Sequence, residues 1–236
     1  MKDIPQIYII LLERDSERSK HVKELVKNQL VNAKIFSAID CKNQKYKEKL
    51  VEYNINISPT FSKMCLSGQI CCMLSHYTLW KKMVDENIQE LIILEDDALP
   101  CSDFYKKLKK CRQELPHNYN FFNMYTSKFH FKNFNKLKKE NFLLQDKNLI
   151  CKYYKTWGTV GYMLTLDFAK DLIKFYQYIY TTLDNQLWDI LQVKKNAYTS
   201  IENLIYTCGQ LNINNKSNKN HLISNIWNSS KYYLTK

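Results

Sequence analysis

Short apolar runs alternate with segments of helical periodicity over most of the chain. Ile7 to Leu12 is continuously apolar, which is typical of a strand buried on both faces of a parallel sheet. Residues 16–30 then repeat their apolar positions at helical spacing, and Lys34 to Ile39 indicates a second strand. Strand, helix and strand in this order predict a βαβ unit.

The same alternation continues towards the carboxyl end. Residues 67–87 predict a long helix, 91–94 a buried strand, and 121–126 and 160–166 two further strands, with Asp167 capping the helix that follows. We therefore expect an α/β sandwich with a mostly parallel central sheet flanked by helices. In such folds ligands bind at the carboxyl ends of the strands.

Three polar segments interrupt this pattern. Residues 41–62 are Lys-rich and lack a clear period, so we interpret them as a surface excursion. Residues 127–150 are a candidate lid or acceptor-side insertion, and the chain after residue 212 is a weakly structured tail. We interpret residues 1–236 as a single domain that carries these additions.

Composition limits the classes of function. Of the 236 residues, 45% are hydrophobic and 25% charged, which excludes disorder as a description of the whole chain. The net charge of +12 favours polyanionic partners such as anionic lipid, nucleic acid or phosphorylated substrates, without choosing among them. No run reaches the ~20 apolar residues of a membrane span, so membrane contact would be peripheral.

The eight cysteines do not form a framework that the sequence can identify. No CxxC pair is present, and the adjacent Cys71 and Cys72 do not have the spacing of a zinc knuckle. We interpret the cysteines as reduced core thiols of a cytosolic protein.

Glu95-Asp96-Asp97 directly follows a predicted buried strand. Three neighbouring carboxylates need a positive counterpart, which could be a divalent cation, a basic cluster or a proton. If the backbone is extended, Glu95 and Asp97 converge while Asp96 points away, and a pair of oxygen ligands suits Mg²⁺ or Mn²⁺. A solvated acidic turn is the alternative.

Several other polar residues lie at predicted strand ends or on the long helix. Arg14 and Arg18 follow the first strand, where cations can meet a phosphate, or they are solvated charges at the start of a helix. Asp40 could bind a ribose or base, or serve as a turn residue. His76 and its neighbour Ser75 flank the apolar stripe of the long helix, where a ligand contact and a structural hydrogen bond both fit.

The last candidates lie in the second half of the chain. Trp157-Gly158-Thr159 precedes a strand. The glycine would let a ligand or a neighbouring backbone approach closely, and the tryptophan ring could stack on a sugar or on a core side chain. Asp184 and Asp189 lie among apolar residues, where a carboxylate can act as a general base. Capping of a short helix is the other interpretation of Asp184.

Taken together, several segments are more specific than any one of them: YIILLERDSERSKHV, SAID, LSGQICCMLSHYTLWKKMV, LIILEDDALPCSDF, TWGTVGYMLTLDFAKDL and TLDNQLWDIL. Their order and spacing resemble glycosyltransferase family 25 over about residues 6 to 210. That family includes bacterial lipooligosaccharide β-1,4-galactosyltransferases and collagen galactosyltransferases. The chain departs from the family pattern at Leu11, Gln69 and Cys71, where the family has Asn, Glu and Gly more often.

The resemblance implies a GT-A-like fold, a UDP-sugar donor (usually UDP-galactose), a Mn²⁺ or Mg²⁺ ion, and inverting transfer to a sugar acceptor. It implies a DxD-like metal and diphosphate site at Glu95, Asp96 and Asp97, and a general base at Asp184 or, failing that, Asp189. It also implies a set of donor-binding residues, namely Arg14, Arg18, Asp40, Ser75, His76, Trp157, Gly158 and Thr159.

The implied acceptor is a lipid-linked oligosaccharide of lipopolysaccharide. We therefore expect a cytoplasmic protein that associates peripherally with the inner face of the inner membrane through its basic surface. Two alternatives stay open: a basic module that binds nucleic acid or membrane without catalysis, and the same fold with another donor such as UDP-glucose. We expect no nucleic-acid partner, because the sequence contains no nucleic-acid-binding motif.

Overall fold

The computed structural model describes residues 4–43, 45–127, 144 and 147–207. Most of the predicted lid at 127–150 and all of the predicted tail after residue 212 lie outside the described residues, so both stay predictions. Within the described residues, no helix is both long and apolar enough to span a bilayer.

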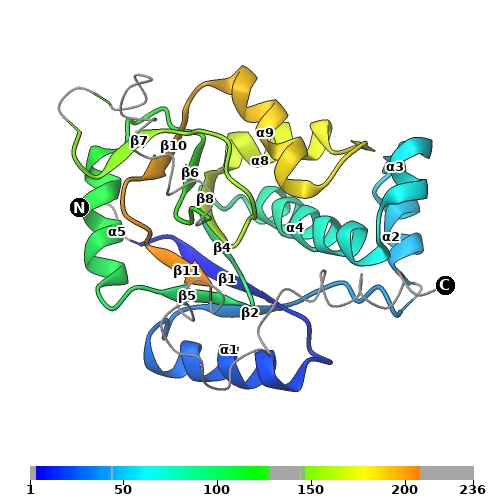
Figure 1. The fold of residues 1–236 in the computed structure, drawn as a ribbon, viewed down its shortest axis with the longest axis horizontal. Coiled ribbons are helices and arrows are strands. Elements are labelled where there is room, and N and C mark those ends of the chain that lie inside the picture. The colour runs from blue at the N-terminus through cyan, green and yellow to red at the C-terminus, as the bar shows by residue number, and fades with distance from the viewer. Residues whose placement is uncertain (1–3, 44, 128–143, 145–146, 208–236) are drawn as a thin grey trace.

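The centre of the molecule is a seven-stranded sheet (Figure 1). Its spatial order is β2-β1-β4-β8-β6-β10-β7. The bounds of these strands are, in chain order, β1 Gln6–Leu11, β2 Lys34–Ser37, β4 Glu90–Glu95, β6 Phe121–Asn123, β7 Ile150–Lys152, β8 Gly161–Thr165 and β10 Ala197–Ser200.

Most strands of this sheet run in one direction. β1 pairs in parallel with β2 and β4, and β6 with β10, whereas β8 and β7 run antiparallel to their neighbours. The carboxyl ends of β2, β1 and β4 therefore meet at one edge of the sheet. The predicted α/β sandwich with a mostly parallel sheet is confirmed.

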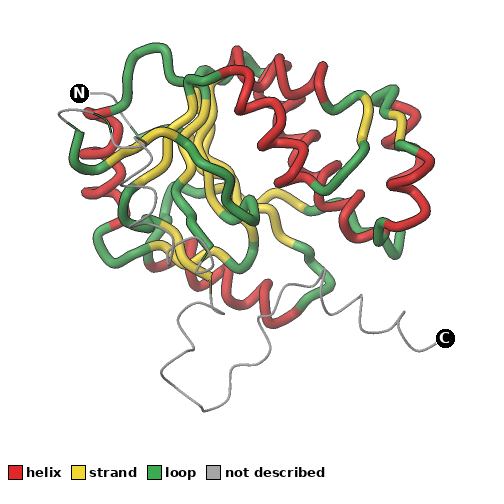
Figure 2. The backbone as a smooth tube through the Cα atoms, turned by 45° about the horizontal axis from the view of Figure 1, so that its top comes forward, coloured by secondary structure: helices red, strands yellow, loops and turns green. Residues whose placement is uncertain are grey.

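Helices cover both faces of the sheet, as Figure 2 shows. The described helices are α1 Ser16–Asn28, α2 Lys45–Glu52, α3 Pro59–Met64, α4 Ser67–Asp85, α5 Phe104–Glu114, α8 Leu166–Phe175 and α9 Leu183–Lys194. The core on one face includes residues of α4, α8 and α9, and the core on the other includes residues of α1 and α5.

The alternation of side chains along β1 shows why both faces are apolar. Tyr8 and Ile10 belong to the core on the α4 side, while Ile7, Ile9 and Leu11 belong to the core on the α1 side. Successive side chains of a strand point to opposite faces, so a continuous apolar run is needed when helices cover both.

Two small sheets complete the fold. β5 (Ala98–Pro100) pairs antiparallel with β11 (Ile205–Thr207), and β3 (Asn56–Ile57) pairs in parallel with β9 (Tyr178–Ile179). β5 begins directly after Asp97, so the β5–β11 pair fixes the chain on the far side of the acidic triplet.

Two local predictions were wrong. Residues 41–62 contain α2, β3 and part of α3 and are more than a surface excursion; α2 has no fully buried residue, which explains its weak apolar pattern. Thr165, not Asp167, caps α8, because the Thr165 side chain accepts a hydrogen bond from the Phe168 N–H. Asp167 lies in the first turn of that helix.

Candidate functional site

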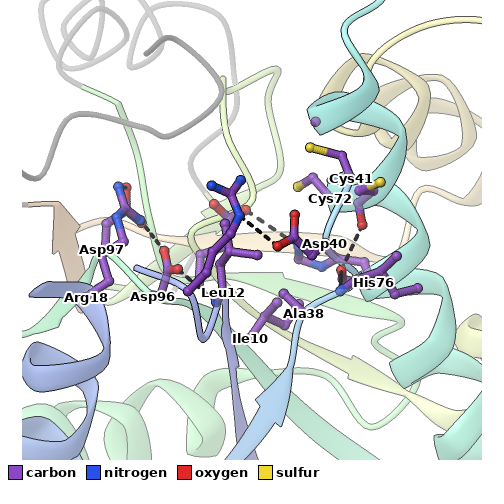
Figure 3. A pocket seen from close by; sticks show the side chains of 16 residues that line it. Ile10, Leu12, Arg18, Ala38, Asp40, Cys41, Cys72, His76, Asp96 and Asp97 are labelled. Carbon is purple, nitrogen blue, oxygen red and sulfur yellow. Dashed lines mark hydrogen bonds and ion pairs between the residues drawn. The ribbon is translucent and has the colours of Figure 1, made fainter. Parts of the chain in front are cut away.

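A cavity opens where β1, β2 and β4 end, beside the first half of α4 (Figure 3). It brings together eight of the predicted site residues. These residues are Arg14, Arg18, Asp40, Ser75, His76, Glu95, Asp96 and Asp97. Their convergence follows from the topology, since parallel strands place their carboxyl ends and the loops after them at one edge.

Of the two interpretations of the acidic triplet, the turn and not the extended pair is observed, but the turn is buried or half-buried and not solvated. Glu95 is the last residue of β4, and Asp96 and Asp97 form a turn before β5. Asp96 therefore does not point away: its carboxylate pairs with Arg18 and accepts a hydrogen bond from the Leu12 N–H at 3.3 Å. All three carboxylates line the same cavity.

Arg18 is a buried partner of the triplet and not a solvated charge at the start of a helix. It lies in the first turn of α1, which Asp15 caps, and it is 3% exposed. Burial alone would lower the pKa of Arg18, but the Asp96 and Asp97 carboxylates raise it above its ordinary value. The guanidinium is thus a buried positive charge at the triplet, and Figure 3 shows Arg18 beside Asp96 and Asp97.

Asp97 is the least compensated carboxylate of the three. It is 8% exposed, its Oδ2 lies 3.9 Å from Arg18 Nη2, and its buried Oδ1 has no hydrogen-bond partner among the described residues. Burial, together with the nearby Glu95 carboxylate, raises the pKa of Asp97 to about 7. Burial also raises the pKa of Asp96, although Arg18 opposes that shift.

The charge of the cavity fits a divalent cation. Two arginines and four carboxylates line it, which leaves two negative charges uncompensated when all four carboxylates are ionised and His76 is counted as neutral. Buried carboxylates are costly unless a cation or a proton compensates them. The unpartnered Asp97 Oδ1 and the carboxylate oxygens beside it are hard donors of the kind that Mg²⁺ and Mn²⁺ prefer.

Two groups from other elements lie against Glu95. The Thr159 hydroxyl donates to Glu95 Oε1 at 2.5 Å, and His76 Nε2 lies 3.6 Å from the same oxygen. Burial alone would raise the pKa of Glu95, but His76 and Thr159 bring it below its ordinary value. Thr159 therefore contributes to the site through Glu95.

His76 lies inside the core and not on the flank of the helix. It is fully buried, and its Nδ1 lies 2.7 Å from the Tyr162 hydroxyl, which also accepts from Trp80 Nε1 at 3.1 Å. Sequence reasoning missed Tyr162 and Trp80, because their apolar surroundings made them resemble ordinary core residues. A chain of polar atoms thus runs from the core to Glu95.

Arg14, Asp40 and Ser75 shape the opposite side of the cavity. Arg14 Nε lies 2.7 Å from Asp40 Oδ2, and the Arg14 side chain is 41% exposed. The Ser75 hydroxyl accepts from the Ile39 N–H at 2.9 Å and donates to the Cys71 carbonyl at 2.7 Å. Ser75 therefore connects α4 to the end of β2, a structural role beside its place in the cavity wall.

The predicted residues of the second half of the chain are only partly connected to this cavity. The Gly158 N–H donates to Asp184 Oδ2 at 3.1 Å, and Asp184 Oδ1 accepts from the Thr182 hydroxyl and the Asn185 N–H. Thr182, not Asp184, is the N-cap of α9. Trp157 is 50% exposed.

Asp189 lies apart from the other predicted residues. Its Oδ2 accepts from the Tyr180 hydroxyl at 2.8 Å in an exposed hydrogen bond, and it does not line the cavity at the end of β4. The structure therefore connects Asp184, through Gly158, to the segment that contacts Glu95, and it offers no such connection for Asp189 among the described residues.

Comparison of the sequence with known proteins places the chain in a family. The sequence model of glycosyltransferase family 25 (LPS biosynthesis protein) matches residues 4–187. Procollagen galactosyltransferase 2 of Homo sapiens is 27% identical over 174 residues, covering 71% of this chain and 27% of that protein. A glycosyltransferase 25 family member of Aedes aegypti is 26% identical over 176 residues, covering 72% of this chain and 28% of that protein.

A third relative is the probable inactive glycosyltransferase 25 family member 3 of Rattus norvegicus. It is 20% identical over 115 residues, covering 47% of this chain and 20% of that protein. The chain spans about a quarter of the length of the procollagen galactosyltransferase that it matches. With the family model covering most of its length, the chain belongs to glycosyltransferase family 25.

Proposed function

We propose that the protein transfers a hexose, namely galactose from UDP-galactose, to a sugar acceptor of a lipooligosaccharide or lipopolysaccharide. The observation that carries the proposal is the cavity at the end of β4. There, two uncompensated negative charges and the unpartnered Asp97 Oδ1 lie beside two arginines. A divalent cation would compensate these two charges, and the cation together with Arg14 would then offer positive charge to the diphosphate of a nucleotide sugar.

Glu95, Asp96 and Asp97 are the residues that would hold the cation, and Asp97 Oδ1 is the free donor among them. Bound there, Mn²⁺ or Mg²⁺ would supply Lewis-acid stabilisation of the negative charge that develops on the UDP leaving group. Arg18 is already engaged by Asp96, so it orients the triplet. The half-exposed Arg14 is the guanidinium that is accessible to an incoming diphosphate.

Asp184 is the better candidate for the general base. Its two carboxylate oxygens are oriented by Gly158, Thr182 and Asn185, whereas Asp189 bonds to Tyr180 on the exposed side of the helix. In the proposed step, the acceptor hydroxyl oxygen attacks the anomeric carbon while its proton passes to Asp184. The bond to UDP breaks on the opposite face, so the configuration inverts without a covalent intermediate.

A donor screen tests the proposal directly. UDP release is measured for UDP-galactose, UDP-glucose and other nucleotide sugars, with Mn²⁺ and with a chelator. We expect UDP-galactose turnover that needs the ion and that Asp97→Ala reduces by about 10³-fold or more. Turnover that survives both the chelator and Asp97→Ala would reject the metal site, and preference for UDP-glucose would reject the donor.

The base is tested with a matched pair of substitutions on one helix. Asp184→Asn should lower the transfer rate by about 10²-fold or more, because general-base catalysis contributes on that order. Asp189→Asn is the control and should change the rate by less than about threefold. A rate for Asp184→Asn that equals the control would eliminate Asp184 as the base.

A basic binding module without catalysis is the other class of function, and the net charge of +12 is the observation that favours it. Tight, steeply salt-dependent binding of nucleic acid, with no affinity for UDP, would support that module. The family assignment and the acidic cavity favour the transferase.

A further inference from the structure

The cavity contains a second group of possible ligands, which differs in chemistry from the acidic triplet. Ligand atoms of Cys72, His76 and Glu95 all lie within 4.8 Å of one another. Cys72 and His76 are four residues apart on α4 and so share one face of the helix, while Glu95 approaches from the end of β4. A helix and a strand thus present three different donor types to one point.

The separation of two of these atoms already fits a bound ion. Two ligand atoms on one tetrahedral zinc ion lie on the order of 3.5 Å apart, given metal–ligand bonds of about 2.0–2.3 Å. His76 Nε2 and Glu95 Oε1 are 3.6 Å apart. This distance is too long for a hydrogen bond between them.

The free nitrogen of His76 is an independent indication of a ligand. His76 is fully buried, yet its Nε2 has no hydrogen-bond partner among the described residues, and it faces Glu95. Buried polar atoms are rarely left unpaired. The other nitrogen, Nδ1, is fixed by Tyr162 at 2.7 Å, and histidine ligands of metals are usually oriented through their second nitrogen in this way.

Coordination through Nε2 requires the proton to be on Nδ1, which then donates to the Tyr162 oxygen. That oxygen also accepts from Trp80 Nε1, and a phenol oxygen has two lone pairs for the two donors. The thiol of Cys72 is half-buried in the cavity wall, so an ion can reach it from solvent.

From this arrangement we propose that Cys72, His76 and Glu95 form a zinc site within the cavity. A thiolate, an imidazole and a carboxylate are the donors that Zn²⁺ selects, whereas Mg²⁺ and Mn²⁺ select oxygen donors. The spacing of the cysteines alone could not predict such a site, because two of its three ligands are not cysteines. Water or substrate would take the fourth position.

Glu95 belongs to both ligand groups. Zinc at Cys72 and His76 therefore withdraws Glu95 from the acidic triplet and makes Zn²⁺ an inhibitor of the transfer reaction. This consequence rests on the proposed function, whereas the site itself does not, because metal binding can be measured without any donor or acceptor.

Cobalt titration of the reduced, chelator-treated protein tests the site, since tetrahedral Co²⁺ replaces Zn²⁺ and is coloured. We expect one equivalent of Co²⁺ to produce visible d–d bands and a thiolate-to-cobalt charge-transfer band, both abolished by Zn²⁺. Cys72→Ser should remove the charge-transfer band. Cys65→Ser is the matched control and should keep it, because Cys65 does not line the cavity.

Alkylation of Cys72, followed by mass spectrometry, gives a second measurement. Saturating Zn²⁺ should slow alkylation of Cys72 by about tenfold or more, because a metal-bound thiolate is not free to react. Glu95→Gln should weaken this protection, with circular dichroism confirming the fold of each variant. Millimolar Mg²⁺ should give no protection.

A charge-transfer band that survives Cys72→Ser, or equal protection by Mg²⁺, would overturn the zinc site. The outcome is separable from that of the donor screen. Protein that binds cobalt through Cys72 but never turns over a nucleotide sugar would support the site and reject the transferase. Turnover of a nucleotide sugar without cobalt binding at Cys72 would support the transferase and reject the zinc site.

Discussion

At the scale of single residues, Asp97 carries the largest electrostatic cost of the proposed donor site. Its carboxylate is buried, lies near Glu95 and Asp96, and has only the distant Nη2 of Arg18 to compensate it. Such a group destabilises the metal-free protein in its ionised form, which is a common property of binding sites.

Asp97 should therefore make the stability of the metal-free protein depend on pH. Its pKa is raised from 3.8 to about 7 in the folded chain, so between those values the folded state holds a proton that the unfolded state has lost. The free energy of unfolding should fall as the pH rises from about 4 to about 7. Asp97→Asn should reduce this slope and raise the Tm at pH 8 in chelator by at least about 3 °C.

Thermal denaturation followed by circular dichroism measures this effect. Asp167→Asn is the control, since the Asp167 side chain is 88% exposed, and it should leave the slope unchanged. Mn²⁺ should raise the Tm of the parent protein and not that of Asp97→Asn. If the free energy of unfolding of Asp97→Asn depended on pH as steeply as that of the parent protein, the Asp97 carboxyl would not be the source of the pH dependence.

Gly158 makes a conformational contribution that no other residue type matches. Its φ of +87° is unfavourable for residues with a Cβ, although an added Cβ would make only ordinary contacts with Tyr125 and Val160 at 3.4 and 3.7 Å. Gly158→Ala should cost about 1–2 kcal/mol, measured by urea unfolding. It should also lower the transfer rate, because a backbone that relaxes away from this φ would move the N–H of residue 158 that orients Asp184. Full activity with unchanged stability would contradict both statements.

At the scale of elements, the site depends on how α4 is attached to the sheet. The Ser75 hydroxyl accepts from the Ile39 N–H just beyond the end of β2, which fixes the wall of the cavity that contains Asp40. Without the Ser75 hydroxyl, the half-buried Ile39 N–H loses its hydrogen-bond acceptor.

Ser75→Ala should destabilise the protein by about 1–2 kcal/mol, the usual cost of an unsatisfied buried donor. Thr78→Val is the control on the same helix, because the Thr78 hydroxyl bonds back to the Leu74 carbonyl and holds no strand backbone. If urea unfolding showed equal destabilisation of the two variants, the loss in free energy of unfolding would come from the hydrogen bond within the helix and not from the bond to Ile39.

Sequence patterns predicted the continuous apolar strands and the helices with a clear apolar stripe, and missed short or weakly patterned elements such as α2, α5 and β10. Residues 91–94 were recognisable as a strand because both of its faces are apolar. α2 was not recognisable as a helix, because it covers the surface and buries none of its residues completely. The acidic triplet was found for its composition, but an extended backbone and a turn both stayed open, since three carboxylates do not distinguish the two.

For the site, the sequence predicted which residues have suitable functional groups, but not how those residues are buried or which groups they contact. Arg18 and His76 were named as candidates, but their burial was not foreseen, because it depends on contacts with residues 78 and 86 positions away in the chain. Tyr162 and Trp80 gave no polar signal at all. Long-range hydrogen bonds of this kind become evident only in the folded structure.

At the scale of the whole molecule, the net charge of +12 contrasts with an acidic cavity. We expect the basic exterior to bind vesicles that contain anionic lipid, and to release them between about 0.05 and 0.5 M salt as the charges are screened. Cosedimentation with anionic and with neutral vesicles measures this. Equal binding to both would contradict an electrostatic contact.

The pairing of β5 with β11 has a practical consequence for anyone who trims this chain. The residues that the family model matches end at 187, and everything proposed here to hold donor, cation or proton, except Asp189, falls within them. Yet the acidic turn runs directly into β5, whose partner strand comes more than a hundred residues later. A fragment cut at the family boundary would keep the proposed reactive groups and lose the strand pair that holds the acidic turn, so inactivity of that fragment would say little about the longer chain.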